Sequence, residues 1–151
     1  MKGIIGVGNI FKRDDGIGIR LLEEIEEGKD LGDIATYEVG SATMDVLHIL
    51  KDLDEVLIID AVNFRGDPGD HRFFTPEEVE SLSGTETAHG TDILRVIEMS
   101  EGLDEIPQKI MIMGIQPRDT EFSEELSEPL KDKFPELVEA LCEKVESYFS
   151  D

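Results

Sequence analysis

At residues 55–60 the chain reads E-V-L-I-I-D, with four aliphatic side chains in a row between two carboxylates. A run of this kind is typical of a strand that is buried on both faces, as in a parallel sheet. Similar apolar runs occur at Lys2–Val7 and at Lys109–Gly114. We therefore expect these three segments to form the centre of one sheet.

The segments around these runs alternate between strand and helix patterns. Amphipathic spacing or helix-start signals predict helices, and shorter apolar runs predict further strands. The expected helices are Asp15–Glu27, Thr43–Leu50, a brief one opening at Thr75-Pro76, Asp92–Met99 and Pro135–Phe149, and the further strands are Ile34–Val39 and Arg72–Phe74. This order predicts an α/β protein with a mostly parallel twisted sheet of about five strands, covered by helices on both faces.

In such a sheet, functional residues gather at the carboxyl ends of the strands, near the point where strand order reverses. If Lys2–Val7 and Glu55–Asp60 are neighbours, the loops that follow them meet at this point.

Length and charge limit the function classes. The chain has 151 residues, which suggests one domain over residues 1–151. Its 14 basic and 36 acidic side chains give a net charge of −22, which argues against binding to nucleic-acid phosphates or to anionic lipid. The excess negative charge raises the local concentration of cations, including metal ions and basic peptides. Adaptation to a host with high intracellular salt would also explain this charge.

The expected compartment is the cytoplasm. Cys142 is the only cysteine, so no internal disulfide forms, and this suits a reducing environment. No apolar run reaches the length of a membrane span, and the N-terminal residues read as a strand rather than as a signal peptide.

The loop after the first strand reads G-V-G-N-I-F-K-R-D-D-G-I-G over residues 6–18. It begins like a dinucleotide-binding fingerprint, but Phe11 stands where the third glycine belongs, and Asp14 and Asp15 would repel a pyrophosphate. Helix capping is the competing interpretation of the two acids. Gly16 and Gly18 each cost a helix about 1 kcal/mol relative to Ala, which suggests a close backbone approach to the sheet or to a ligand.

Asp60 ends a buried strand and therefore needs a partner, although backbone amides alone would satisfy it. His89 lies in a polar loop, whereas the position of His48 suggests packing and that of His71 a surface role. Together Asp15, Asp60 and His89 form an oxygen and nitrogen donor set that suits nickel, zinc, manganese or iron. The sequence contains no serine-elbow or H-E-x-x-H motif, so serine-elbow hydrolases and zincins lose support.

Four features resemble the hydrogenase maturation endopeptidases in order and spacing. They are the loop at residues 6–18, L-I-I-D-A-V at 57–62, G-S-A-T-M-D at 40–45 and His89. The resemblance implies a three-layer α/β/α fold and an enzyme that removes a C-terminal extension from the large-subunit precursor of a nickel–iron hydrogenase. It also implies that Asp15, Asp60 and His89 contact nickel carried by that precursor, and that the Gly40-Ser41 turn lies near the substrate cleft. The short His-Gly form resembles the branch that serves deazaflavin-reducing hydrogenases.

The leading hypothesis is therefore a processing protease in which Asp15, Asp60 and His89 grip the nickel of its substrate. Metal-activated water and a carboxylate general base both stay open as mechanisms. A non-catalytic metal-binding checkpoint protein for the same precursor is the main alternative, followed by a nucleotide-binding domain and a general peptidase.

Overall fold

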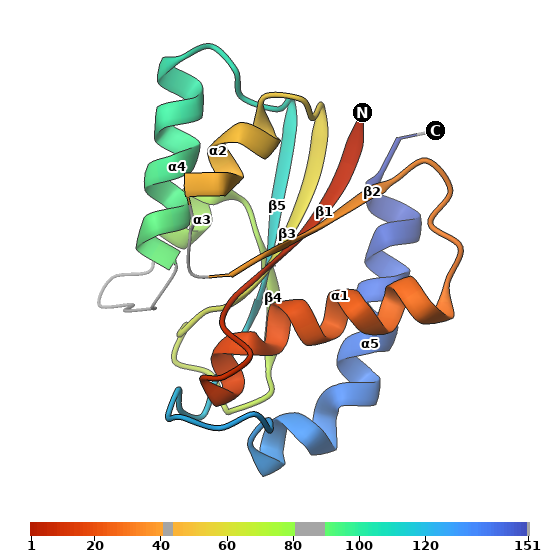
Figure 1. Ribbon diagram of the computed structural model, residues 1–151, viewed down its shortest axis with the longest axis vertical. Helices are drawn as coiled ribbons and strands as arrows, with labels where there is room; N and C mark the ends of the chain where they lie inside the picture. The colour runs from red at the N-terminus through yellow and green to blue at the C-terminus, as the bar shows by residue number, and fades with distance from the viewer. Residues whose placement is uncertain (41–43, 81–89, 151) are drawn as a thin grey trace.

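A computed structural model of the chain describes residues 1–40, 44–80 and 90–150. Five strands form one sheet in the spatial order β2-β1-β3-β5-β4, and only β4 runs antiparallel to its neighbour (Figure 1). The strands are β1 (Lys2–Val7), β2 (Ala35–Val39), β3 (Glu55–Ala61), β4 (His71–Phe74) and β5 (Lys109–Ile115). The predicted mostly parallel sheet of about five strands is confirmed.

Helices cover both faces of this sheet, which confirms the three-layer α/β/α arrangement (Figure 1). On one face lie α1 (Ile17–Gly28) and α5 (Glu128–Tyr148), and on the other lie α2 (Met44–Leu50), α3 (Pro76–Glu80) and α4 (Gly90–Gly102). A short 3₁₀ helix, η1 (Arg13–Gly16), leads into α1. Across the described part of the chain, no helix is both long enough and apolar enough to cross a bilayer.

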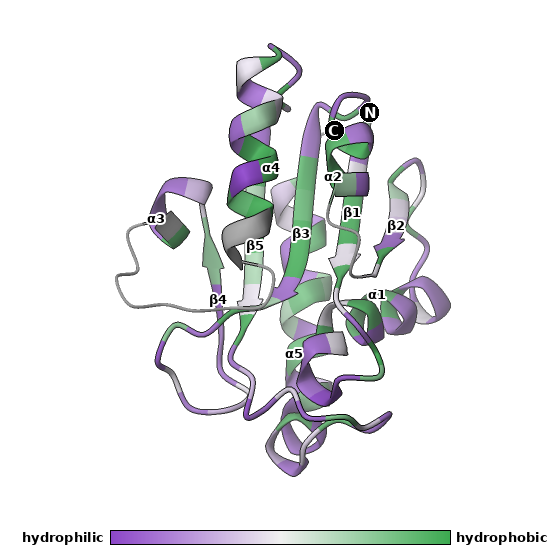
Figure 2. Ribbon diagram, turned by 60° about the vertical axis from the view of Figure 1, so that its left-hand side comes forward, coloured by the Kyte–Doolittle hydropathy of each residue, from purple (hydrophilic) through white to green (hydrophobic). Residues whose placement is uncertain are grey.

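The strand β3 is buried on both faces, as its composition predicts. Val56 and Ile58 pack with α2 and α4, whereas Leu57 and Ile59 pack with α1 and α5. This alternation follows from the two-residue period of a strand. Figure 2 shows the same property as continuous hydrophobic colour along the middle of β1 and β3. The sheet therefore has two hydrophobic cores, one under each helical layer.

The last helix begins earlier than the sequence predicts. Pro135 looks like the first residue of a helix, but it lies inside α5, and Ser127 is the N-cap. Pro135 cannot donate a hydrogen bond to the carbonyl four residues earlier, which disfavours a proline in a helix interior. The helix continues because its first turns bury Leu130 completely and pack Phe134 against the core of the α1 and α5 layer.

The order of the strands places a topological switch point between β1 and β3. From β1 the chain goes outward to β2, and it then returns to β3 on the other side of β1. In open α/β sheets such a point opens a crevice at the carboxyl ends of the two strands. The segment η1, which follows the loop after Val7, contacts β3 there.

Candidate active site

The loop after β1 holds Asp15 at this switch point. Gly8 has a φ of +144°, and a Cβ atom there would lie 1.9 Å from the Asp15 carbonyl oxygen, so only glycine fits. The Asp15 side chain is 1% exposed, and the Asn9 amide donates to its Oδ2 at 2.9 Å. A glycine turn and a backbone amide thus orient a buried carboxylate.

Asp60 lies near the end of β3 and is equally buried. Its side chain is 1% exposed, and the Ala61 amide donates to Oδ1 at 2.8 Å. Because Ile59 packs on the α1 and α5 side, alternation directs Asp60 toward the face covered by α2, α3 and α4. The apolar strand β3 thus carries a buried carboxyl group directly before its last residue, Ala61.

The start of α1 packs closely on the ends of β1 and β3. A Cβ atom on Gly18 would lie 2.3 Å from the Ile59 carbonyl oxygen and 2.7 Å from that of Val7. The helix therefore sits directly on the carboxyl ends of β1 and β3, and η1 contacts β3. The close approach expected from Gly18 is made to the sheet, and Asp15 and Asp60 lie on adjoining elements at the switch point.

His89 and Ser41 fall outside the described residues. The next residue after His89, Gly90, begins α4, which leads into the parallel strand β5. Figure 1 shows α4 running antiparallel to β5, so α4 begins toward the carboxyl edge of the sheet. Within residues 1–40, 44–80 and 90–150, no three His, Cys, Asp or Glu side chains are grouped to hold a metal ion.

Asp14 has a role that the sequence did not reveal. Its fully buried carboxylate accepts hydrogen bonds from the amides of Arg118 and Ser127, both at 2.8 Å, and from the Ser127 hydroxyl at 2.7 Å. The N-cap of α1 is Gly16, so capping of this helix does not explain Asp14. Asp14 instead ties η1, and with it Asp15, to the segment between β5 and α5.

Gln116 organises the other side of the same edge and was also missed. It follows β5, is 7% exposed, and its Oε1 accepts from the amides of Phe64 and Gly66 at 2.9 and 3.0 Å. Its Nε2 donates to Asn63 Oδ1 at 3.1 Å. Gln116 therefore fixes the loop that follows Asp60. The sequence signal that could have revealed Gln116 is a polar residue at the end of a buried strand, which is the signal that revealed Asp60.

The two other histidines lie on the surface. His71 is exposed at the start of β4, which confirms the surface prediction. His48 is also exposed, so the prediction that packing explains it was wrong. The buried face of α2 carries Val46 and Leu50 instead, and His48 falls between them on the opposite side of the helix.

Comparisons with known proteins agree on one family. The family model described as hydrogenase maturation protease matches residues 19–144. The Hydrogenase 2 maturation protease of Escherichia coli K12 is 30% identical over 121 residues, which cover 78% of this chain and 74% of that protein. The hydrogenase expression/formation protein HupD of Bradyrhizobium diazoefficiens is 26% identical over 144 residues, which cover 93% of this chain and 75% of that protein.

A solved structure extends the likeness to the fold. The hydrogenase maturating endopeptidase HybD from E. coli superimposes with a TM-score of 0.82 at 27% identity, covering 98% of this chain and 94% of that one. The [NiFe] hydrogenase maturation protease HycI from Thermococcus kodakarensis shares the fold, with a TM-score of 0.66 at 23% identity.

Proposed function

This chain belongs to the hydrogenase maturation protease family and is therefore a peptidase, and we propose that it removes a C-terminal extension from a nickel-loaded hydrogenase large-subunit precursor. The observation that carries this proposal is the pair of buried carboxylates, Asp15 and Asp60, on adjoining elements at the switch point. Two carboxyl groups on adjoining elements supply oxygen donors of the kind that a divalent cation binds.

The nickel ion of the substrate is the cation that we propose for this site. Asp15 and Asp60 supply two oxygen donors, and we assign the third, nitrogen, donor to His89. A mixed oxygen and nitrogen set with open positions suits a divalent transition metal. The high negative charge of the chain also favours the approach of a cation. In this proposal the protein tests whether the metal has been inserted before it makes an irreversible cut.

Binding of the metal also orients the bond to be cleaved, and this orientation accelerates the reaction. Water is then activated either by the metal or by a carboxylate that acts as general base. Both routes need an ionised carboxylate, either as a metal ligand or as the base. Asp14 and Gln116 contribute indirectly, because their hydrogen bonds hold the loops on which Asp15 and Asp60 depend.

Nickel loading of the precursor is expected to control cleavage. The purified protein should shorten the nickel-loaded precursor at least about 100-fold faster than the nickel-free form, because the metal positions the scissile bond. Mass spectrometry of the precursor C-terminus measures the product directly. Equal cleavage of both forms would contradict metal gating, and binding without shortening would instead favour the checkpoint alternative.

His89→Ala is expected to slow cleavage of the nickel-loaded precursor by about 100-fold, since one of three donors to the metal is lost. His71→Ala is the matched control, because His71 is an exposed histidine on β4, and it should cleave at the wild-type rate. The two variants are compared in the same mass-spectrometric assay. An H89A protein as active as H71A would remove His89 from the site.

A further inference from the structure

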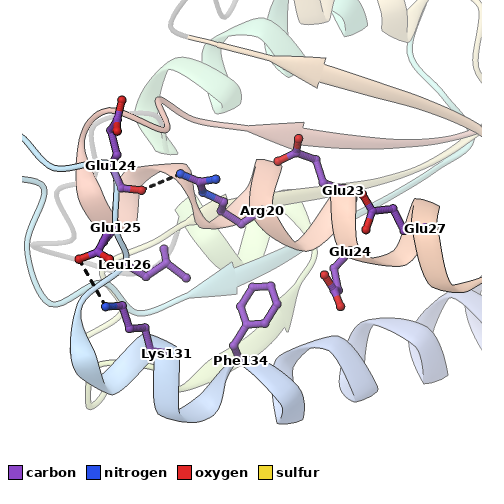
Figure 3. Close-up of a pocket in the computed structure, with 9 residues that line it drawn as sticks. All are labelled: Arg20, Glu23, Glu24, Glu27, Glu124, Glu125, Leu126, Lys131 and Phe134. Atoms are coloured by element: carbon purple, nitrogen blue, oxygen red, sulfur yellow. Dashed lines mark hydrogen bonds and ion pairs between the residues drawn. The ribbon is translucent and has the colours of Figure 1, made fainter.

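A hollow with a volume of about 500 Å³ lies between α1, the segment Glu124–Leu126 and α5 (Figure 3). We call it the acidic groove. Its apolar lining comes from Leu126 and Phe134, which are both partly buried against the core. Figure 3 shows Phe134 on α5 and Glu24 on α1 pointing into the space between the two helices. The groove therefore combines an apolar base with charged walls.

The charge of these walls is strongly negative. Five carboxylates line the groove, three from α1 and two from the adjacent segment, against Arg20 and Lys131. Arg20 donates to the backbone carbonyl of Glu124 at 2.7 Å rather than to a carboxylate. Lys131 lies 3.6 Å from Glu125 and 3.6 Å from Glu128, which is outside hydrogen-bond distance. No ion pair within the described residues involves the three α1 carboxylates, Glu23, Glu24 and Glu27.

These α1 carboxylates destabilise their own helix electrostatically. Glu23 and Glu27 are four residues apart and repel each other, and the last turn of α1 has no basic residue to offset the negative end of its dipole. Burial raises the pKa of the Glu38 carboxyl on β2, and the charges of Glu23 and Glu26 raise it further. A basic binding partner would reduce this repulsion.

The backbone next to the groove wall is hydrogen-bonded to the loop that leads to Asp15. Its wall at Glu124–Leu126 follows Ser123, whose amide donates to the Phe11 carbonyl at 3.0 Å and whose carbonyl accepts from the Arg13 amide at 2.9 Å. Phe11 and Phe122, on the two loops joined here, are 48% and 86% exposed. An apolar rim thus connects the loop that carries Asp15 to the acidic groove.

We propose that the acidic groove binds a basic, partly apolar segment of the hydrogenase precursor at a distance from the bond that is cut. This inference rests on the proposed function, because it takes the precursor as the occupant on the ground that the groove adjoins the active-site rim. Lysine or arginine side chains of the segment face the glutamates, and an apolar side chain contacts Phe134. Such complementary charge increases the rate of encounter and selects the partner.

The triple variant Glu23→Gln, Glu24→Gln and Glu27→Gln tests the groove. Gln keeps nearly the helix propensity of Glu, and these positions are exposed, so the fold is retained. We expect KM for the nickel-loaded precursor to rise at least about 10-fold, with kcat within about twofold of the wild type. Added salt should weaken the wild type more than the variant. The midpoint of thermal unfolding should rise, since repulsion within α1 is removed.

The matched control is Asp52→Asn, Glu105→Gln and Glu139→Gln, which removes the same charge from exposed positions that line no cavity described here. Its KM should stay within about twofold of the wild type. An unchanged KM in the groove variant, or an equal rise in the control, would overturn the proposal. Calorimetric titration of the nickel-free precursor, which is expected to be cut at least about 100-fold more slowly, measures binding to each protein. Failure of the groove is thereby distinguished from failure of the proposed proteolysis.

Discussion

Replacing Asp60 by Asn is expected to slow cleavage of the nickel-loaded precursor by about 10²- to 10⁴-fold. The variant keeps the shape of the side chain, and the Asn oxygen can still accept the Ala61 amide that now donates to Oδ1 at 2.8 Å. The substitution removes the negative charge, and with it the ability to bind a cation or accept a proton. We expect the variant to remain folded, since the hydrogen bond from the Ala61 amide can be kept. Precursor mass spectrometry and a thermal melt give the two readouts.

The exposed Asp33→Asn variant is the control for Asp60→Asn and should cleave at the wild-type rate. A second comparison tests whether Asp15 and Asp60 act as one unit. If both hold the same ion, the double variant D15N/D60N should lose about as much activity as either single variant, since one broken donor already disables the site. Losses that multiply would assign the two acids to separate steps. Wild-type activity in D60N would remove the carboxylate pair from the mechanism altogether.

Most of the fold could be predicted because its strands have one local signature. A strand buried on both faces needs continuous aliphatic residues, and β1, β3 and β5 show this without reference to the rest of the chain. The first residue of α5 could not be predicted from a local sequence signal. Ser127 and Pro135 both carry helix-start signals, and only the burial of Leu130 in the assembled core decides between them.

The candidate site could be predicted where a local rule applied. Asp60 stands out because it is an acid near the end of an apolar strand, and Asp15 because it lies in the loop that follows another such strand. Parallel strands bring such segments to one edge of the sheet. Asp14 sits in the same loop, yet its partners Arg118 and Ser127 lie 104 and 113 positions along the chain. No spacing rule connects residues so far apart, so its anchoring role became visible only in three dimensions.

Replacing Gly18 by Ala is expected to destabilise the protein by about 3 kcal/mol or more, although Ala is the better helix former. The added Cβ would lie 2.3 Å from the Ile59 carbonyl oxygen and 2.7 Å from that of Val7. Both are backbone atoms in central strands, so neither can move aside as a side chain can. The start of α1 must therefore shift away from the sheet and carry Asp15 away from Asp60. Urea unfolding measures the stability loss, and precursor cleavage should fall with it.

Gly28→Ala is the control for Gly18→Ala, since both positions lie in α1. No atom lies within 4 Å of a Cβ built at Gly28, so Ala should be neutral or stabilise by up to about 1 kcal/mol. If the two substitutions change the free energy of unfolding in opposite directions, the effect at Gly18 comes from the close approach to the sheet and not from helix propensity. If Gly18→Ala were as stable as Gly28→Ala, α1 could be seated differently on the sheet. The contact that places Asp15 beside the end of β3 would then not depend on glycine.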